Sequence, residues 1–153
     1  MLHIVQLAIN PWWDSWNGEK RPSTGNILSL CWCVMDALIF NPDRHYGNFG
    51  IMFDTDTMKH MCMCPVFDNN RSLFPDLDQD QLEHPDWYLE RCRPIIGKNF
   101  LITARGVLTQ EIRTDLKNLL GFQFRQHEAI TAPQERLDAL SAIVNRQMKA
   151  ILE

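Results

Sequence analysis

The stretch DALIFNPDRHYGNFG, residues 36–50, contains the transition that decides the fold. It joins the end of an apolar run to a polar loop. Residues 27–40 are apolar almost throughout, which predicts a helix that is buried nearly all round. Asn41-Pro42 ends this helix, because the residue before a proline avoids the α-helical region. A polar loop, residues 41–48, therefore begins at the end of a buried helix.

A β-hairpin is expected directly after this loop. Residues 49–53 and 59–66 have the composition of short strands, and residues 54–57 (Asp-Thr-Asp-Thr) have the composition of a turn. A second polar turn, residues 67–70, leaves the second strand. The sequence thus predicts two polar segments at the two ends of one hairpin.

These two segments carry side chains that suit a cation. The start of the first strand and the end of the second are neighbours in an antiparallel hairpin, so we expect Asp43, Asn48 and Asp68 to converge. Two carboxylates and an amide oxygen are hard ligands of the kind that Mg²⁺ shares with water and substrate phosphates. Phosphoryl transfer uses the same set: an Asp beside the accepting hydroxyl, an Asn five residues later and a further Asp on the metal.

The motifs themselves are specific. The pattern D-x-L-I-x-N-x-D-R-H-x-G-N-F-G spans residues 36–50, and P-x-F-D-N spans residues 65–69. Together they resemble the HipA-like bacterial protein kinases, and the D-R-H-x-x-N loop is also similar to that of phosphatidylinositol kinases. The likeness covers residues 36–73 and is diffuse beyond them. It implies an α+β, mainly helical fold: a protein-kinase-like C-lobe in which a short β-hairpin carries the catalytic and metal-binding loops.

The resemblance also implies a role for each matching residue. Asp43 corresponds to the catalytic base, and Arg44 and His45 would brace the catalytic loop. Asn48 and Asp68 correspond to the metal-binding Asn and Asp, so they would hold Mg²⁺ and, through it, ATP.

Two further positions belong to the same comparison. Asp36 lies where the family often has an acidic residue on the preceding helix. Asn70 stands where the family commonly has Gly, and Asn tolerates a left-handed conformation if the turn needs one there.

The nucleotide-cradling part of a kinase is not expected from these residues. Gly18 and Gly25 do not form a glycine-rich loop, and Lys20 lies in a Trp- and Pro-rich stretch rather than in a strand. We therefore expect a C-lobe with its N-lobe absent. Such a lobe would transfer the γ-phosphoryl group of ATP to a Ser or Thr hydroxyl only if a partner or a longer parent chain supplied the N-lobe, and the isolated chain should be inactive.

Composition and length agree with a single folded lobe. The 153 residues are 45% hydrophobic and include five Trp and eight Phe, which excludes a disordered chain. We expect an irregular Trp-rich arm over residues 1–26 and the HipA-like lobe over residues 27–153. The net charge of −4 argues against nucleic acid as a partner, since phosphate-backbone binding needs concentrated Lys and Arg.

The rest of the chain is predicted to be helical or solvated. Residues 75–94 are acidic and interrupted by Pro, which indicates a solvated loop with short helical turns. One amphipathic helix should run from the N-cap Thr109 to Gly121. A second should begin near Thr131, whose capping box with Gln134 includes Pro133 in the first turn, and its apolar stripe continues to Leu152.

The cysteines and the chain's N-terminal stretch bear on location. Cys31-x-Cys33 and Cys62-x-Cys64 do not have the spacing of a structural zinc site, and together with Cys92 they are typical of small thiols in a reducing cytoplasm. No signal-peptide pattern precedes the apolar run, and that run is too short to span a membrane. We expect a cytoplasmic protein without a membrane partner.

Two other functions stay open at this stage. The lobe could be a non-catalytic binding or regulatory module, with the Trp-rich arm as its interaction surface. Alternatively, Asp43, His45 and Asp68 could serve a metal-dependent phosphohydrolase. Binding of Mg²⁺ and ATP, or activity on a phosphodiester, distinguishes these possibilities from the kinase.

Overall fold

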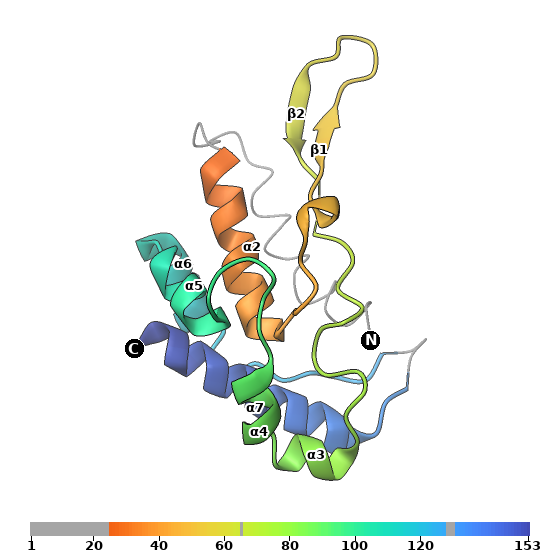
Figure 1. Ribbon diagram of the computed structural model, residues 1–153, viewed down its shortest axis with the longest axis vertical. Coiled ribbons are helices and arrows are strands. Elements are labelled where there is room, and N and C mark those ends of the chain that lie inside the picture. Colours follow the sequence, from red (N-terminus) through yellow and green to blue (C-terminus); the bar gives the residue numbers. More distant parts are fainter. Residues whose placement is uncertain (1–24, 65, 128–130) are drawn as a thin grey trace.

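The structure is a computed structural model that describes residues 25–64, 66–127 and 131–153 (Figure 1). The described residues are mainly helical, as the sequence predicts. The elements are α2 (Gly25–Ile39), the 3₁₀ turn η1 (Tyr46–Asn48), β1 (Ile51–Phe53), β2 (His60–Met63), α3 (Gln79–Glu83), α4 (Asp86–Arg91), α5 (Phe100–Gly106), α6 (Gln110–Asn118) and α7 (Gln134–Leu152).

Helix α2 is the predicted apolar helix, and it packs against α5 and α7. It ends at Ile39, and Phe40 takes the left-handed conformation with φ 50°. The Asn41 amide then donates to the Asp36 carbonyl at 2.9 Å, which is the long backbone hydrogen bond of a Schellman-type helix end. The helix also includes Gly25 and Asn26, so the prediction of an irregular arm up to residue 26 is wrong for these two residues. Residues 1–24 of that arm lie outside the described residues.

The predicted hairpin is confirmed, with shorter strands than expected. Strands β1 and β2 pair antiparallel and form a two-stranded sheet that projects away from the helices (Figure 1). The turn between them forms because the Asp54 carboxylate accepts hydrogen bonds from the Asp56 amide and from the amide and hydroxyl of Thr57. Beyond β2, the Cys64 amide still donates to the Gly50 carbonyl at 2.8 Å. The hairpin thus begins and ends beside the two polar segments.

The two predicted C-terminal helices exist, but only one has the predicted cap. Thr109 caps α6, because its hydroxyl accepts the Ile112 amide at 3.2 Å. The capping box at Thr131 is wrong: α7 begins one residue after Pro133, and no side chain caps it. The Gln126 side-chain amide instead holds the backbone of Ala132.

Helix α7 organises the core. It contacts α2, α3, α5 and α6, and its inner face is buried. The buried residues of this face include most of the predicted stripe: Leu137, Leu140, Ile143, Val144, Met148 and Ile151. Its Arg136 guanidinium also donates to the carbonyls of Phe74 and Leu77, at 3.0 and 2.8 Å. These two bonds fix the segment that follows the second polar turn.

The intervening segments include one helix that the sequence pattern does not predict. In the acidic region, α3 and α4 are the expected short helical turns, and a capping box between Asp78 and Gln81 starts α3. Helix α5 was not predicted. Asn99 caps it by accepting the Ile102 amide at 2.8 Å, and Phe100 packs edge-on against Phe40 below α2.

Three thiols of the described residues are free and half-buried: Cys33, Cys64 and Cys92. Burial raises the pKa of the Cys33 and Cys92 thiols, so both are protonated near neutral pH. No helix in the described part of the chain is long and apolar enough to cross a membrane.

Candidate functional site

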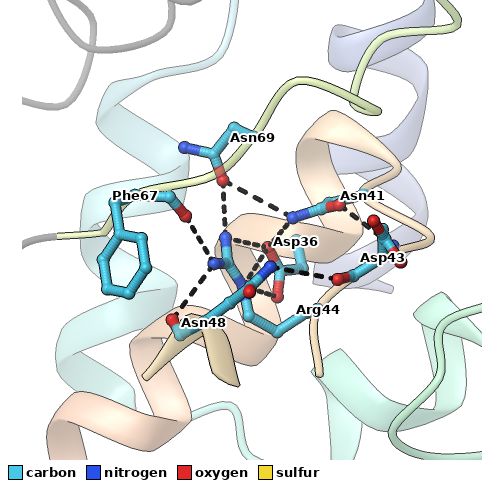
Figure 2. A network of polar contacts seen from close by, with 7 residues as sticks. All are labelled: Asp36, Asn41, Asp43, Arg44, Asn48, Phe67 and Asn69. Carbon is cyan, nitrogen blue, oxygen red and sulfur yellow. Dashed lines mark hydrogen bonds and ion pairs between the residues drawn. The ribbon is translucent and has the colours of Figure 1, made fainter. Parts of the chain in front are cut away.

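The centre of the candidate site is a buried ion pair between α2 and the loop that follows it. Arg44 is only 4% exposed, and Figure 2 shows its guanidinium lying against the Asp36 carboxylate. Nε lies 3.0 Å from Asp36 Oδ2, and Nη2 lies 3.0 Å from Oδ1. This two-point contact fixes the plane of the guanidinium and gives the buried carboxylate its counter-charge.

The same guanidinium reaches the second polar turn. Nη1 donates to the Phe67 carbonyl at 2.7 Å, and Nη2 donates to Asn69 Oδ1 at 2.5 Å (Figure 2). Phe67 and Asn69 are the two neighbours of Asp68. Arg44 therefore connects the loop that contains Asp43 to the turn that contains Asp68, across the base of the hairpin.

Asn41 supplies a second connection between the same segments. It has no exposed surface, and its amide donates to Asp36 Oδ1 at 3.1 Å and, more weakly, to Asn69 Oδ1 at 3.5 Å. Its own oxygen accepts the backbone amide of Asp43 at 3.1 Å. A single buried side chain thus sets the position of the Asp43 main chain relative to α2 and the turn.

Asn48 is held at the other end of the loop. The residue is 3% exposed, and its side-chain amide donates to the Asp43 carbonyl at 3.2 Å. Arg44 Nη1 also contacts the Asn48 carbonyl, at 3.4 Å. Both ends of the Asp43–Asn48 segment are therefore fixed to each other and to Arg44.

His45 has a local role in the structure. Its side chain is exposed, and its Nδ1 accepts the Gly47 amide at 3.1 Å, which caps the 3₁₀ turn η1. We expected His45 and Arg44 to brace the loop together. Arg44 does so from the interior, whereas His45 shapes only the turn beside it.

The three expected metal-binding side chains differ in their hydrogen bonding from the residues that support them. Among the described residues, no hydrogen-bond donor contacts the carboxylates of Asp43 and Asp68 or the side-chain oxygen of Asn48. By contrast, the side-chain oxygens of Asp36 and Asn69 accept hydrogen bonds from Arg44 and Asn41, and that of Asn41 accepts the Asp43 backbone amide. The supporting residues thus use their side-chain oxygens within the protein, and the candidate ligands keep theirs available.

The turn itself has an unusual backbone. Asp68 has φ 56°, in the left-handed region that few residues other than Gly adopt. Asn70 is not among the described residues with positive φ, so the turn does not need a left-handed conformation at that position. The left-handed position is two residues earlier, and it directs the chain through the turn at the candidate ligand itself.

Burial and charge act in opposite directions on Asp36. Burial raises the pKa of its carboxyl group, and hydrogen bonds from Arg44 and Asn41, with the Arg44 charge, work against that rise. Asp36 therefore depends on Arg44 for its stability as an anion.

The sequence indicates that Asn41 ends a helix but does not place Asn41 or Asn69 in the site, although both lie within the quoted motifs. Their spacing could have indicated a role in the site, because Asn41 stands two residues before Asp43 and Asn69 directly follows Asp68. What the sequence could not provide is that the two side chains lie next to each other, with Asn41 bonded to Asp36 and Asn69 bonded to Arg44.

The site does not have the composition of a protein-only metal centre. Within residues 25–64, 66–127 and 131–153, no group of three or more His, Cys, Asp or Glu side chains is placed to hold a metal ion. The candidate set has two carboxylates and one amide oxygen, which is the partial shell that Mg²⁺ takes when substrate phosphates and water complete it.

Comparison of the chain with protein-family models, with curated proteins and with solved structures found no significant match.

Proposed function

We propose that this chain is a HipA-like protein kinase C-lobe that transfers the γ-phosphoryl group of ATP to a Ser or Thr hydroxyl when an N-lobe is supplied to it. The N-lobe would come from a partner protein or from a longer parent chain. The proposal rests on the motif resemblance of residues 36–73 and on one structural observation that supports it.

That observation is the placement of Arg44. Phosphoryl transfer depends almost entirely on positioning, so the base and the metal ligands must be held in a fixed relation. Arg44 contacts Asp36 on α2, the Asn48 carbonyl in the first loop and the residues on either side of Asp68. A buried cation that joins these segments would keep Asp43, Asn48 and Asp68 in register.

Each site residue has a role that suits its surroundings. Asp43, half-buried with its carboxylate uncommitted among the described residues, would accept the proton of the substrate hydroxyl. Asn48 and Asp68 would hold Mg²⁺, since both retain an oxygen that no described donor uses. When bound, Mg²⁺ would neutralise the phosphate charge. Asp36, Asn41 and Asn69 would position these groups without touching the substrate.

Nucleotide binding provides the first test. The full chain would be titrated with Mn²⁺ and ATP, and backbone NMR signals of residues 43–48 and 67–69 would be followed. Paramagnetic broadening that is strongest at these residues and falls off with distance from them is expected, and Asp68→Asn should abolish it. Asp56→Asn is the matched control, because Asp56 is an exposed carboxylate in the hairpin turn. Absence of broadening in the unmodified chain contradicts the metal site and favours a non-catalytic binding module.

Phosphoryl transfer provides the second test. Radiolabelled ATP would be incubated with the chain alone and with candidate N-lobe proteins. We expect incorporation only in the presence of a completing partner and its loss in Asp43→Asn. Phosphorylation by the isolated chain that survives Asp43→Asn would refute the assignment. Hydrolysis of a phosphodiester by the isolated chain with Mn²⁺ would instead identify a phosphohydrolase.

A further inference from the structure

A cavity lies away from the candidate site, between α4, α5 and α7. Its volume is about 500 Å³, which is within the range of small-molecule pockets. Apolar side chains form part of its wall: Phe40, Leu89, Phe100, Leu101 and Ile143. None of Asp43, Asn48 and Asp68 lines it, so it is separate from the proposed phosphoryl-transfer site.

Four charged side chains line the same cavity, two of each sign. Asp86 and Arg146 pair with each other at 2.5 Å and so join α4 to α7. Glu90 and Arg93 remain. Neither forms an ion pair with any described residue, and the Arg93 guanidinium makes only a 3.0 Å contact with the carbonyl of the preceding Cys92. The cavity therefore presents one uncommitted carboxylate and one uncommitted guanidinium beside an apolar wall.

This arrangement favours a ligand that carries a positive group, a negative group and an apolar group. We propose that the cavity binds a small zwitterion of the amino-acid class with an apolar side chain. The ligand carboxylate would face Arg93, because guanidinium groups bind carboxylates through paired hydrogen bonds. Its ammonium group would face Glu90, and its side chain would lie against Leu89 and Leu101, the partly exposed apolar residues of the wall. This inference does not depend on the kinase proposal.

Charge balance favours a zwitterion over a simple anion or cation. The four charged side chains sum to zero, and a ligand with a single charge would pair with only one of Glu90 and Arg93 and leave the other to solvent. A ligand with one charge of each sign satisfies both groups. The volume accommodates an aromatic or branched aliphatic side chain in addition.

The test is an NMR titration of the full chain with L-phenylalanine and two analogues. N-acetyl-L-phenylalanine lacks the ammonium charge, and L-phenylalaninamide lacks the carboxylate. We expect L-phenylalanine to shift the signals of residues 89–93, 99–101 and 143–150, with each analogue binding about fivefold more weakly. Equal binding of all three compounds overturns the charge assignments. If L-phenylalanine causes no shifts up to its solubility limit, the proposed site is wrong.

Two variants assign the charged contacts individually. Arg93→Gln should weaken L-phenylalanine about fivefold and remove the difference between L-phenylalanine and its amide. Glu90→Gln should do the same for the N-acetyl compound. Both residues are exposed, so these variants keep the fold, and Arg125→Gln and Glu135→Gln are exposed controls outside the cavity. Retention of full discrimination by Arg93→Gln and Glu90→Gln contradicts the proposal.

Discussion

Arg44 is a fixed cation that is enclosed by the protein and opposed by one carboxylate. Removing water from both charges is costly, so the pair is stable only because its hydrogen-bonding groups are satisfied. The guanidinium meets this condition through Asp36, the Phe67 carbonyl and Asn69. Arg44 is costly to bury and joins three segments. A role in positioning these segments therefore explains its presence better than a contribution to stability alone.

Replacement of Arg44 should therefore be much more damaging than replacement of a surface arginine. Arg44→Met leaves the Asp36 carboxylate buried without its partner, and we expect a loss of about 3–5 kcal/mol in the free energy of unfolding. Urea denaturation measures this loss. Arg71→Met is the matched control: Arg71 pairs with Asp76 at 3.3 Å, but both side chains are more than half exposed, so its loss should be below about 1 kcal/mol. Equal effects of the two substitutions would contradict the role given to Arg44.

The sequence predicted this site in part, and the reason is local. The loop and the turn could be placed because a helix stop, turn residues and hairpin geometry follow from short-range patterns around Asp43 and Asp68. The positioning roles of Asn41 and Asn69 could not be predicted, because the two side chains contact each other across 28 residues of sequence. Short-range patterns identify where polar segments lie, but not which amides pair within them.

At the level of single elements, one of two predicted helix caps forms and the other does not. Thr109 and Thr131 both precede apolar helical stripes and look alike in sequence. Only Thr109 caps its helix, because the chain before α7 is held instead by Gln126 and the helix begins after Pro133. The contact of Gln126 with Ala132 lies outside the Thr131-x-x-Gln134 pattern, so that pattern does not predict it.

The two threonines should respond differently to the same substitution. Thr109→Ala removes the hydroxyl that accepts the Ile112 amide and should cost about 1 kcal/mol of stability. Thr131→Ala removes no cap and should change stability by less than about 0.5 kcal/mol. Thermal unfolding of both variants compares them directly. A larger loss for Thr131→Ala would mean that α7 begins with the capping box after all.

The hairpin turn has a pH dependence that belongs to Asp54. Hydrogen bonds from the Thr57 backbone and then from its side chain lower the pKa of the Asp54 carboxyl below its usual 3.8. Because the folded value is the lower one, the turn gains stability from this group above the unfolded pKa and loses it as the pH falls through the folded value.

NMR titration of the full chain tests this dependence. The Asp54 carboxyl should titrate below pH 3.8, and the Thr57 amide signal should shift with the same midpoint. In Asp54→Asn the Thr57 shift should disappear. A normal midpoint for Asp54, or a Thr57 signal that does not follow it, would contradict the hydrogen-bonded turn.

At the scale of the whole molecule, the candidate site is built into the helical core. The Leu73 amide donates to the Ile39 carbonyl at 2.8 Å, which joins the segment after the second turn to the end of α2. Arg136 of α7 then holds the Phe74 and Leu77 carbonyls. The loops of the site are thus anchored on both sides by elements that share one apolar core, although the hairpin between them projects from it (Figure 1).

Loss of core packing far from the site should consequently unfold the site together with the helices. Met148 lies on the buried face of α7 and is 1% exposed, so Met148→Ala leaves a cavity that should cost about 2–5 kcal/mol. The exposed neighbour Lys149 provides the control, since Lys149→Ala should change stability by less than about 0.5 kcal/mol.

Urea unfolding would be followed by circular dichroism for the helices and by the NMR amide signals of Arg44, Asn48 and Asn69 for the site. Both probes should give one midpoint, and Met148→Ala should lower that midpoint equally in both, because the Ile39–Leu73 bond and the Arg136 contacts transmit the loss of the core to both loops. Site signals that disappear at a lower urea concentration than the helical signal would show instead that the loops fold independently of α7.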